Sequence, residues 1–162
     1  MSKIMELDDF EIHSDISGIE VEYYAIYFFY LIEWAYSRKL LSDELETYEL
    51  FIDNIKQVRN KEIDCFDFLS KQLDFKLCTS FFKDDIVIEF IKLYIGIDYD
   101  PHIREHMWQG GELWIQTELI TNTYKPMESK ALMEDIDNTF KLFLEINYPD
   151  KVGDYFPLKY NR

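Results

Sequence analysis

Residues 23–36 read YYAIYFFYLIEWAY and carry eight aromatic side chains in fourteen positions. Ser17 and Glu20 precede this stretch with the spacing of a capping box, which predicts a helix from about residue 19 to residue 38. Its apolar side chains would cover almost the whole circumference, and such a helix is usually enclosed by other elements. We therefore expect this segment to be the buried central helix of the fold.

The same stretch is a poor candidate for a membrane span. Only residues 23–32 are free of charge, whereas a transmembrane helix needs about 20 consecutive apolar residues. Glu22 and Glu33 border the uncharged segment, and its tyrosine hydroxyls would need hydrogen-bond partners in lipid. The N-terminal residues also lack the pattern of a signal peptide. We expect a cytoplasmic protein that does not bind membranes.

Caps and apolar spacing predict further helices around the central one. Ser42 would cap a helix that ends near Asn60, and Asp64 would cap a short helix through Leu69. Apolar periodicity predicts two more, over about 80–95 and 126–148, the last one opened by Pro126. The residues expected to face the core are Leu45, Tyr48, Ile52, Ile55 and Val58; then Phe82, Ile86, Phe90, Leu93 and Tyr94; and, in the last helix, Leu132, Ile136, Phe140, Phe143 and Leu144.

The predicted fold is mainly α, a single domain over residues 1–162 with about five helices packed around the aromatic-rich one. Residues 1–16 are expected to form an irregular acidic lead-in. Residues 149–162 are expected to form an irregular C-terminal strap, held by Tyr155 and Phe156. Gly110-Gly111 has the character of a two-residue hairpin turn, so a short β-hairpin or loop is preferred there. A helix interrupted by the glycines is the alternative.

The charge of the chain bounds its possible partners. Thirty-two acidic and seventeen basic residues give a net charge of −15. A negative field of this size repels nucleic-acid phosphates and anionic lipids, whereas it attracts basic proteins. Solubility alone is the alternative explanation for the acidity. If a partner exists, we expect it to be a basic protein.

Few residues suggest enzymatic chemistry. His102 and His106 lie four apart, with Asp98 and Asp100 nearby, but the glutamate of a zincin motif is misplaced and Pro101 disfavours a helix. Neither a nucleophile elbow nor a phosphate-binding loop is present. The paired acids Asp84-Asp85 and Glu134-Asp135 are expected at solvated helix edges, and Cys65 and Cys78 as reduced, buried thiols. We expect no cofactor and no metal.

Several short motifs resemble a family of small acidic bacterial proteins of unknown function. They are Asp8, Asp9 and His13; Trp34; Leu41-Ser-Asp-Glu-Leu45; Lys61-Glu-Ile63; and Asp67-Phe-Leu69, so the resemblance covers about residues 7–70. The lead-in departs from the family pattern, because an aromatic residue beside the histidine and a following glycine pair are missing. This family implies no activity. In size, acidity and expected location the chain is also similar to bacterial toxin-immunity proteins.

These observations predict a non-enzymatic binding protein, with an immunity protein that covers the active site of a cationic toxin as the leading hypothesis. Trp108 and Trp114 could serve as interface anchors, since tryptophan is enriched at binding hot spots. The alternative is that both rings fold back on the helices. A small metal-dependent hydrolase that uses His102 and His106 is one alternative, and a structural or regulatory module of a larger assembly is another. The predicted partner-binding residues are Glu46, Glu49, Asp53, Asp98, Asp100, Trp108 and Trp114.

Overall fold

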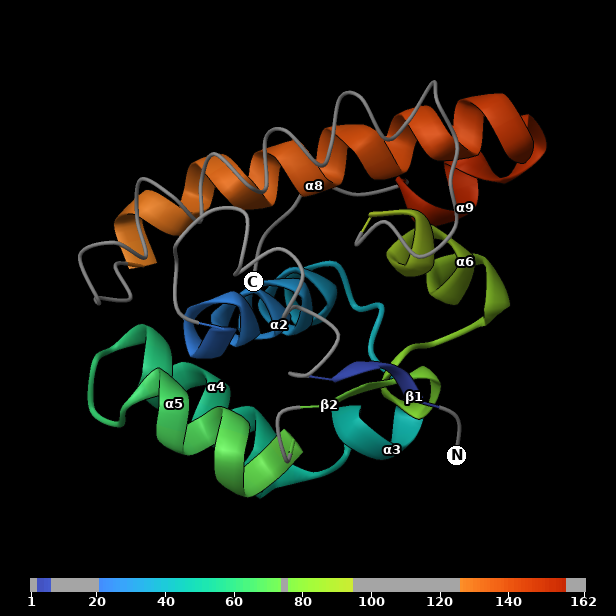
Figure 1. The fold of residues 1–162 in the computed structure, drawn as a ribbon. Helices are drawn as coiled ribbons and strands as arrows, with labels where there is room; N and C mark the ends of the chain where they lie inside the picture. Colours follow the sequence, from blue (N-terminus) through green and yellow to red (C-terminus); the bar gives the residue numbers. More distant parts are fainter. Residues whose placement is uncertain (1–2, 7–20, 74–75, 95–125, 157–162) are drawn as a thin grey trace.

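The computed structural model describes residues 3–6, 21–73, 76–94 and 126–156, and within these ranges the molecule is mainly α-helical, as predicted (Figure 1). The prefix η marks the 3₁₀ helices and one π-helix. The elements in chain order are β1 (Lys3–Glu6), α2 (Val21–Ser37), α3 (Asp43–Glu46), α4 (Glu49–Arg59), α5 (Cys65–Phe68), the π-helix η2 (Leu69–Leu73), β2 (Lys76–Cys78), η3 (Thr79–Phe81), α6 (Asp85–Tyr94), α8 (Pro126–Asn147), η5 (Pro149–Lys151) and α9 (Val152–Tyr155).

Helix α2 occupies the centre of the molecule, with α8 on one side and α4 and α5 on the other (Figure 1). Every side chain from Phe29 to Tyr36 is buried, and Trp34 is fully enclosed. The Trp34 ring meets Phe140 of α8 edge to face, with 5.4 Å between the ring centroids. Burial of this much aromatic surface is the main source of stability in such a core. The predicted buried central helix is confirmed.

A sharp reversal follows the end of α2. Lys39 has a left-handed backbone with φ of 60°, and the amide of Leu40 donates to the carbonyl of Ala35 at 2.7 Å. This is a Schellman motif, which satisfies the last carbonyl groups of the helix. The reversal places Leu40 and Leu41 in the core at 2% and 1% exposure, and directs the chain into α3 on the outside of the molecule.

The helix predicted from Ser42 to Asn60 is in fact two helices. Ser42 caps α3 as expected, but α3 ends after a single turn. The Thr47 hydroxyl donates to the carbonyls of Asp43 and Glu44, and such side-chain bonds compete with continuation of a helix. As a result Tyr48, predicted to face the core, is 46% exposed.

The inward faces of the helices otherwise follow the apolar spacing closely. Leu45, Ile52 and Ile86 are half-buried at the edge of the core. Leu132 lies among residues whose side chains the structure does not describe. The predicted residues that are buried are Ile55, Val58, Phe82, Phe90, Leu93, Tyr94, Ile136, Phe140, Phe143 and Leu144.

Helix α6 begins five residues later than the apolar spacing predicts. The chain forms η3 over Thr79–Phe81, and α6 begins only at Asp85. Asp84 causes the shift, because its carboxylate accepts from the Val87 amide at 3.0 Å in the manner of an N-terminal cap.

Two short strands form an antiparallel pair that the sequence does not predict. β1 lies within the expected irregular lead-in, and it pairs with β2 through Met5 opposite Leu77 and Glu6 opposite Lys76. Strands of three and four residues are too short to show the alternating pattern that identifies a strand. The hairpin predicted at Gly110-Gly111 lies outside the described residues.

The C-terminal segment is helical up to Tyr155 rather than irregular. Pro149 ends α8 and opens η5, a position that suits proline because its nitrogen has no hydrogen to donate. The Tyr155 ring meets Phe140 at 5.3 Å, and the Phe156 ring lies 5.8 Å from the same side chain. Tyr155 and Phe156 therefore hold this segment to α8, as expected.

Candidate binding surface

The exposed side chains of α3, the turn after it and the start of α4 form what we call the acidic surface. Two large side chains are exposed on it, Tyr48 at 46% and Leu50 at 54%. In the part of the chain that the structure describes, none of its four exposed carboxylates forms an ion pair. The residues of the acidic surface are Asp43, Glu44, Tyr48, Glu49, Leu50 and Asp53.

Helix electrostatics explain part of this composition. Asp43, Glu44 and Glu49 lie in first turns, where a carboxylate interacts favourably with the helix dipole. The same argument does not account for Asp53 in the second turn of α4. It also does not explain Tyr48, which occupies the N-cap of α4 without a side-chain hydrogen bond to the helix. Serine, threonine, aspartate and asparagine are the residues that stabilise this position.

Two of the predicted partner-binding residues belong to this surface. Glu49 and Asp53 are exposed and lie one turn apart on α4. Glu46 is only half-buried rather than exposed, and it takes part in another interaction within the molecule. Sequence reasoning missed Tyr48 and Leu50, because Tyr48 fits the apolar spacing of one continuous helix. Thr47 is the signal that could have indicated a break.

The other predicted residues, Asp98, Asp100, Trp108 and Trp114, lie outside the described residues, as do His102 and His106. Among the residues that are described, no three His, Cys, Asp or Glu side chains come together as possible metal ligands. No helix in those same ranges has the length and apolar character needed to cross a membrane.

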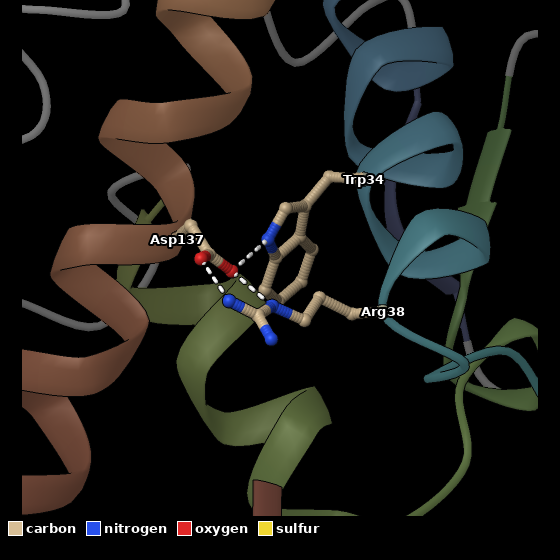
Figure 2. A network of polar contacts seen from close by, with 3 residues as sticks. All are labelled: Trp34, Arg38 and Asp137. Carbon is tan, nitrogen blue, oxygen red and sulfur yellow. Dashed lines mark hydrogen bonds and ion pairs between the residues drawn. The ribbon is translucent and has the colours of Figure 1, made fainter. Parts of the chain in front are cut away.

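In the interior, by contrast, acidic side chains are paired with arginines. Asp137 of α8 accepts from the indole nitrogen of Trp34 at 3.1 Å and from Nε of Arg38 at 2.6 Å (Figure 2). A second guanidinium nitrogen of Arg38 completes a two-pronged ion pair with the same carboxylate. The guanidinium carbon also lies 4.4 Å from the centroid of the Phe156 ring. Carboxylate and ring together fix this arginine between α2 and α8.

A second arginine is held in the same way between α2 and α4. Nε of Arg59 donates to Glu33 at 2.6 Å, and its terminal nitrogen donates to the Ser37 hydroxyl at 2.8 Å. The Arg59 guanidinium carbon lies 5.3 Å from the centroid of the Tyr36 ring. Glu33 is only 3% exposed, so its charge needs a partner inside the protein. Arg59 supplies that partner.

Known proteins give no match. No family model fits the chain, and no curated protein or solved structure matches it. The resemblance of residues 7–70 to small acidic bacterial proteins therefore stays a prediction, and the surface is interpreted from its own chemistry.

A hollow of about 450 Å³ lies where α6 meets the C-terminal segment, lined in part by Asp84, Asp85 and Tyr155. The Tyr155 hydroxyl donates to Asp84 at 2.6 Å, and the other oxygen of Asp84 caps α6. Burial raises the pKa of Tyr155, and the hydrogen bond to Asp84 raises it further. Both oxygens of Asp84 thus hold secondary structure in place. Asp84 therefore anchors the segment, whereas only Asp85 is exposed as predicted.

Glu134 and Asp135 differ in the same manner. Glu134 is exposed, whereas Asp135 is half-buried and accepts from the Tyr94 hydroxyl at 3.3 Å. One member of each predicted acid pair therefore contacts a buried tyrosine, and the other faces solvent.

Cys65 and Cys78 are free and buried, which confirms the sequence prediction. Burial raises the pKa of the Cys65 thiol, and the negative charges of Asp64 and Glu33 raise it further. The thiolate is the nucleophilic form of cysteine. Cys65 is therefore protonated at neutral pH and behaves as a small apolar core residue.

Proposed function

We propose that the chain is a non-enzymatic binding protein whose acidic surface covers a basic region of a protein partner. The observation that carries this proposal is the exposure of Tyr48 and Leu50 among four carboxylates that have no internal cation in the described structure. Aromatic side chains provide binding energy at the centre of interfaces, and surrounding charges determine which partner approaches. The net charge of −15 supports a cationic partner.

The biological role that we propose is immunity. A cytoplasmic protein of this charge could cover the cationic active site of a toxin such as a nuclease, with its carboxylates taking the places of substrate phosphates. Glu49 and Asp53 are the residues expected to make these contacts. The rigid interior supports such a role, because α4 is fixed to α2 by the Glu33–Arg59 pair and presents its carboxylates from a defined position.

Affinity capture with matched variants tests this proposal. The wild-type chain, E49K/D53K and the control E134K/E145K are used as baits in lysate of the native cell. The control makes the same change of charge at two exposed positions on α8. We expect a basic protein to bind the wild type and the control but not E49K/D53K.

The captured protein is then purified and its activity is measured with increasing amounts of each variant. We expect stoichiometric loss of activity with the wild type and the control, and none with E49K/D53K. Equal capture by all three baits, or a captured partner without excess positive charge, would contradict the proposal.

A further inference from the structure

We propose that the acidic surface receives an arginine side chain of its partner, with the guanidinium stacked on the Tyr48 ring and paired with a neighbouring carboxylate. This inference rests on the proposed function and specifies the chemistry of the contact. Glu49 follows Tyr48 directly, and Glu44 lies four positions before it, in α3. Tyr48 is the ring of this proposed arginine site, and Glu49 is its first carboxylate.

The interior of the same molecule shows how two of its arginines, Arg38 and Arg59, are held. Arg38 combines an ion pair with Asp137 and a ring contact of 4.4 Å with Phe156. Arg59 combines an ion pair of 2.6 Å with Glu33 and a ring contact of 5.3 Å with Tyr36. In both cases a carboxylate and an aromatic ring bind one guanidinium together. These are the two groups that the acidic surface presents to solvent.

The acidic surface lacks the cation that is present in the two interior sites. Within the described ranges, neither the Tyr48 ring nor the Glu49 carboxylate contacts an arginine or a lysine. The five positions from Glu49 to Asp53 contain two acids and no base. Since the described residues supply no positive group here, we assign this role to a partner selected by the negative charge.

Arginine suits this site better than lysine. The guanidinium group is planar and weakly hydrated, so it can stack on a ring while its edge donates two hydrogen bonds to a carboxylate. An ammonium group is strongly hydrated and lacks the planar face. An exposed contact between a cation and a ring is worth about 2- to 5-fold in affinity, which sets the upper limit for a preference that arises from stacking.

The position of Tyr48 in α4 supports a role in binding rather than in folding. It is the N-cap of the helix, yet its side chain makes no capping hydrogen bond. Nearly half of its surface remains in water, so the ring contributes little to the core. Serine at this site would serve the helix better, which offers a variant that removes the ring without weakening the fold.

Two peptides of equal length, one alternating glycine with arginine and the other glycine with lysine, provide the test. Their affinities for the full chain are measured by fluorescence anisotropy at fixed ionic strength. We expect the arginine peptide to bind the wild type more tightly than the lysine peptide, by up to about 5-fold. Y48S should abolish this preference, and E49Q should reduce it.

Matched controls come from α8, where Glu145 and Ile146 form an exposed acidic and apolar pair without an aromatic ring. Ile146 is 49% exposed, close to the value for Tyr48. E145Q and I146A should keep the full preference for arginine. Circular dichroism of Y48S verifies that the variant is folded.

Equal affinity for the two peptides, or an arginine preference that survives in Y48S, would overturn the inference. In that case the proposed function would still stand if E49K/D53K binds neither peptide and no longer captures the partner. If neither peptide binds and no basic partner is captured, the arginine site and the proposed function are both wrong.

Discussion

The α2 interior and the acidic surface contain the same chemical groups in two different states. At the interface of α2 with α8, a carboxylate and a ring enclose Arg38. On the acidic surface, Glu49 and Tyr48 face solvent with no such cation in the described structure. A group whose counter-charge is internal contributes to folding. A group whose counter-charge is external contributes little to folding and remains available to a partner.

Removal of the internal cation should have the largest effect on stability. Arg38→Ala leaves Asp137 with its negative charge in a site where the paired side chains are only 9% and 17% exposed. Breaking a buried ion pair on one side costs about 3 kcal/mol or more. We expect a loss of this size in the free energy of unfolding measured by urea titration.

The double variant R38M/D137L should be less destabilised than R38A, because it leaves no isolated charge. If R38A unfolds at the same urea concentration as the wild type, the Arg38–Asp137 pair does not stabilise the fold and the contrast fails.

Tyr155→Phe removes an internal hydrogen bond to a charged acceptor, and we expect a loss of about 1.5–3 kcal/mol in the free energy of unfolding. The pKa of Tyr155 is raised in the folded protein, by burial first and by the bond to Asp84 second. The unfolded chain therefore releases this proton first as the pH rises beyond about 10. Stability from Tyr155 is fully present at lower pH and declines above that value.

Urea titrations of the wild type and Y155F at neutral and alkaline pH check this behaviour. The stability difference between the two proteins should shrink as the pH rises. A stability difference that stays constant with pH would mean that unfolding does not depend on the ionisation of Tyr155.

Substitution of Tyr48 on the acidic surface should raise the free energy of unfolding, whereas the substitutions in the interior lower it. Tyr48→Ser introduces a hydroxyl at the N-cap of α4, where serine gains about 1 kcal/mol over residues that cannot cap. We expect the free energy of unfolding to rise by up to this amount, although the arginine preference is lost. A destabilised Y48S would assign the ring to the fold and remove the distinction between the two regions.

The smallest expected effect is that of Glu49→Gln. Because Glu49 is exposed, its replacement should change the free energy of unfolding by no more than about 0.5 kcal/mol. Thermal unfolding of E49Q beside R38A measures the two regions on one scale. A loss comparable to that of R38A would reveal an internal role for Glu49.

The sequence predicts the helical fold well where burial is decisive. The density of rings in residues 23–36 identifies α2, and Pro126 and Pro149 mark the limits of α8. Apolar spacing fails at Tyr48, because the spacing alone does not take account of Thr47, whose hydroxyl bonds back to Asp43 and Glu44. Similarly, Asp84 alone moves the start of α6.

The candidate site is harder to predict than the fold. Glu49 and Asp53 could be identified, because charged residues opposite an apolar face are expected in solvent. The aromatic half of the surface could not, because Tyr48 satisfies the same spacing as buried neighbours such as Ile55. The ring contacts of Arg38 and Arg59 depend on residues distant in sequence, so local patterns hold no trace of them.

The bond between Trp34 and Asp137 joins residues 103 positions apart, which sets an order of events during translation. At about 5–20 residues per second, α2 leaves the ribosome roughly 5–20 s before its partner on α8 is made. During that interval the most aromatic helix of the protein lacks the α8 side chains that cover Trp34 and neutralise Arg38. A nascent chain stalled before residue 137 should consequently be a strong substrate for chaperones that bind exposed aromatic segments.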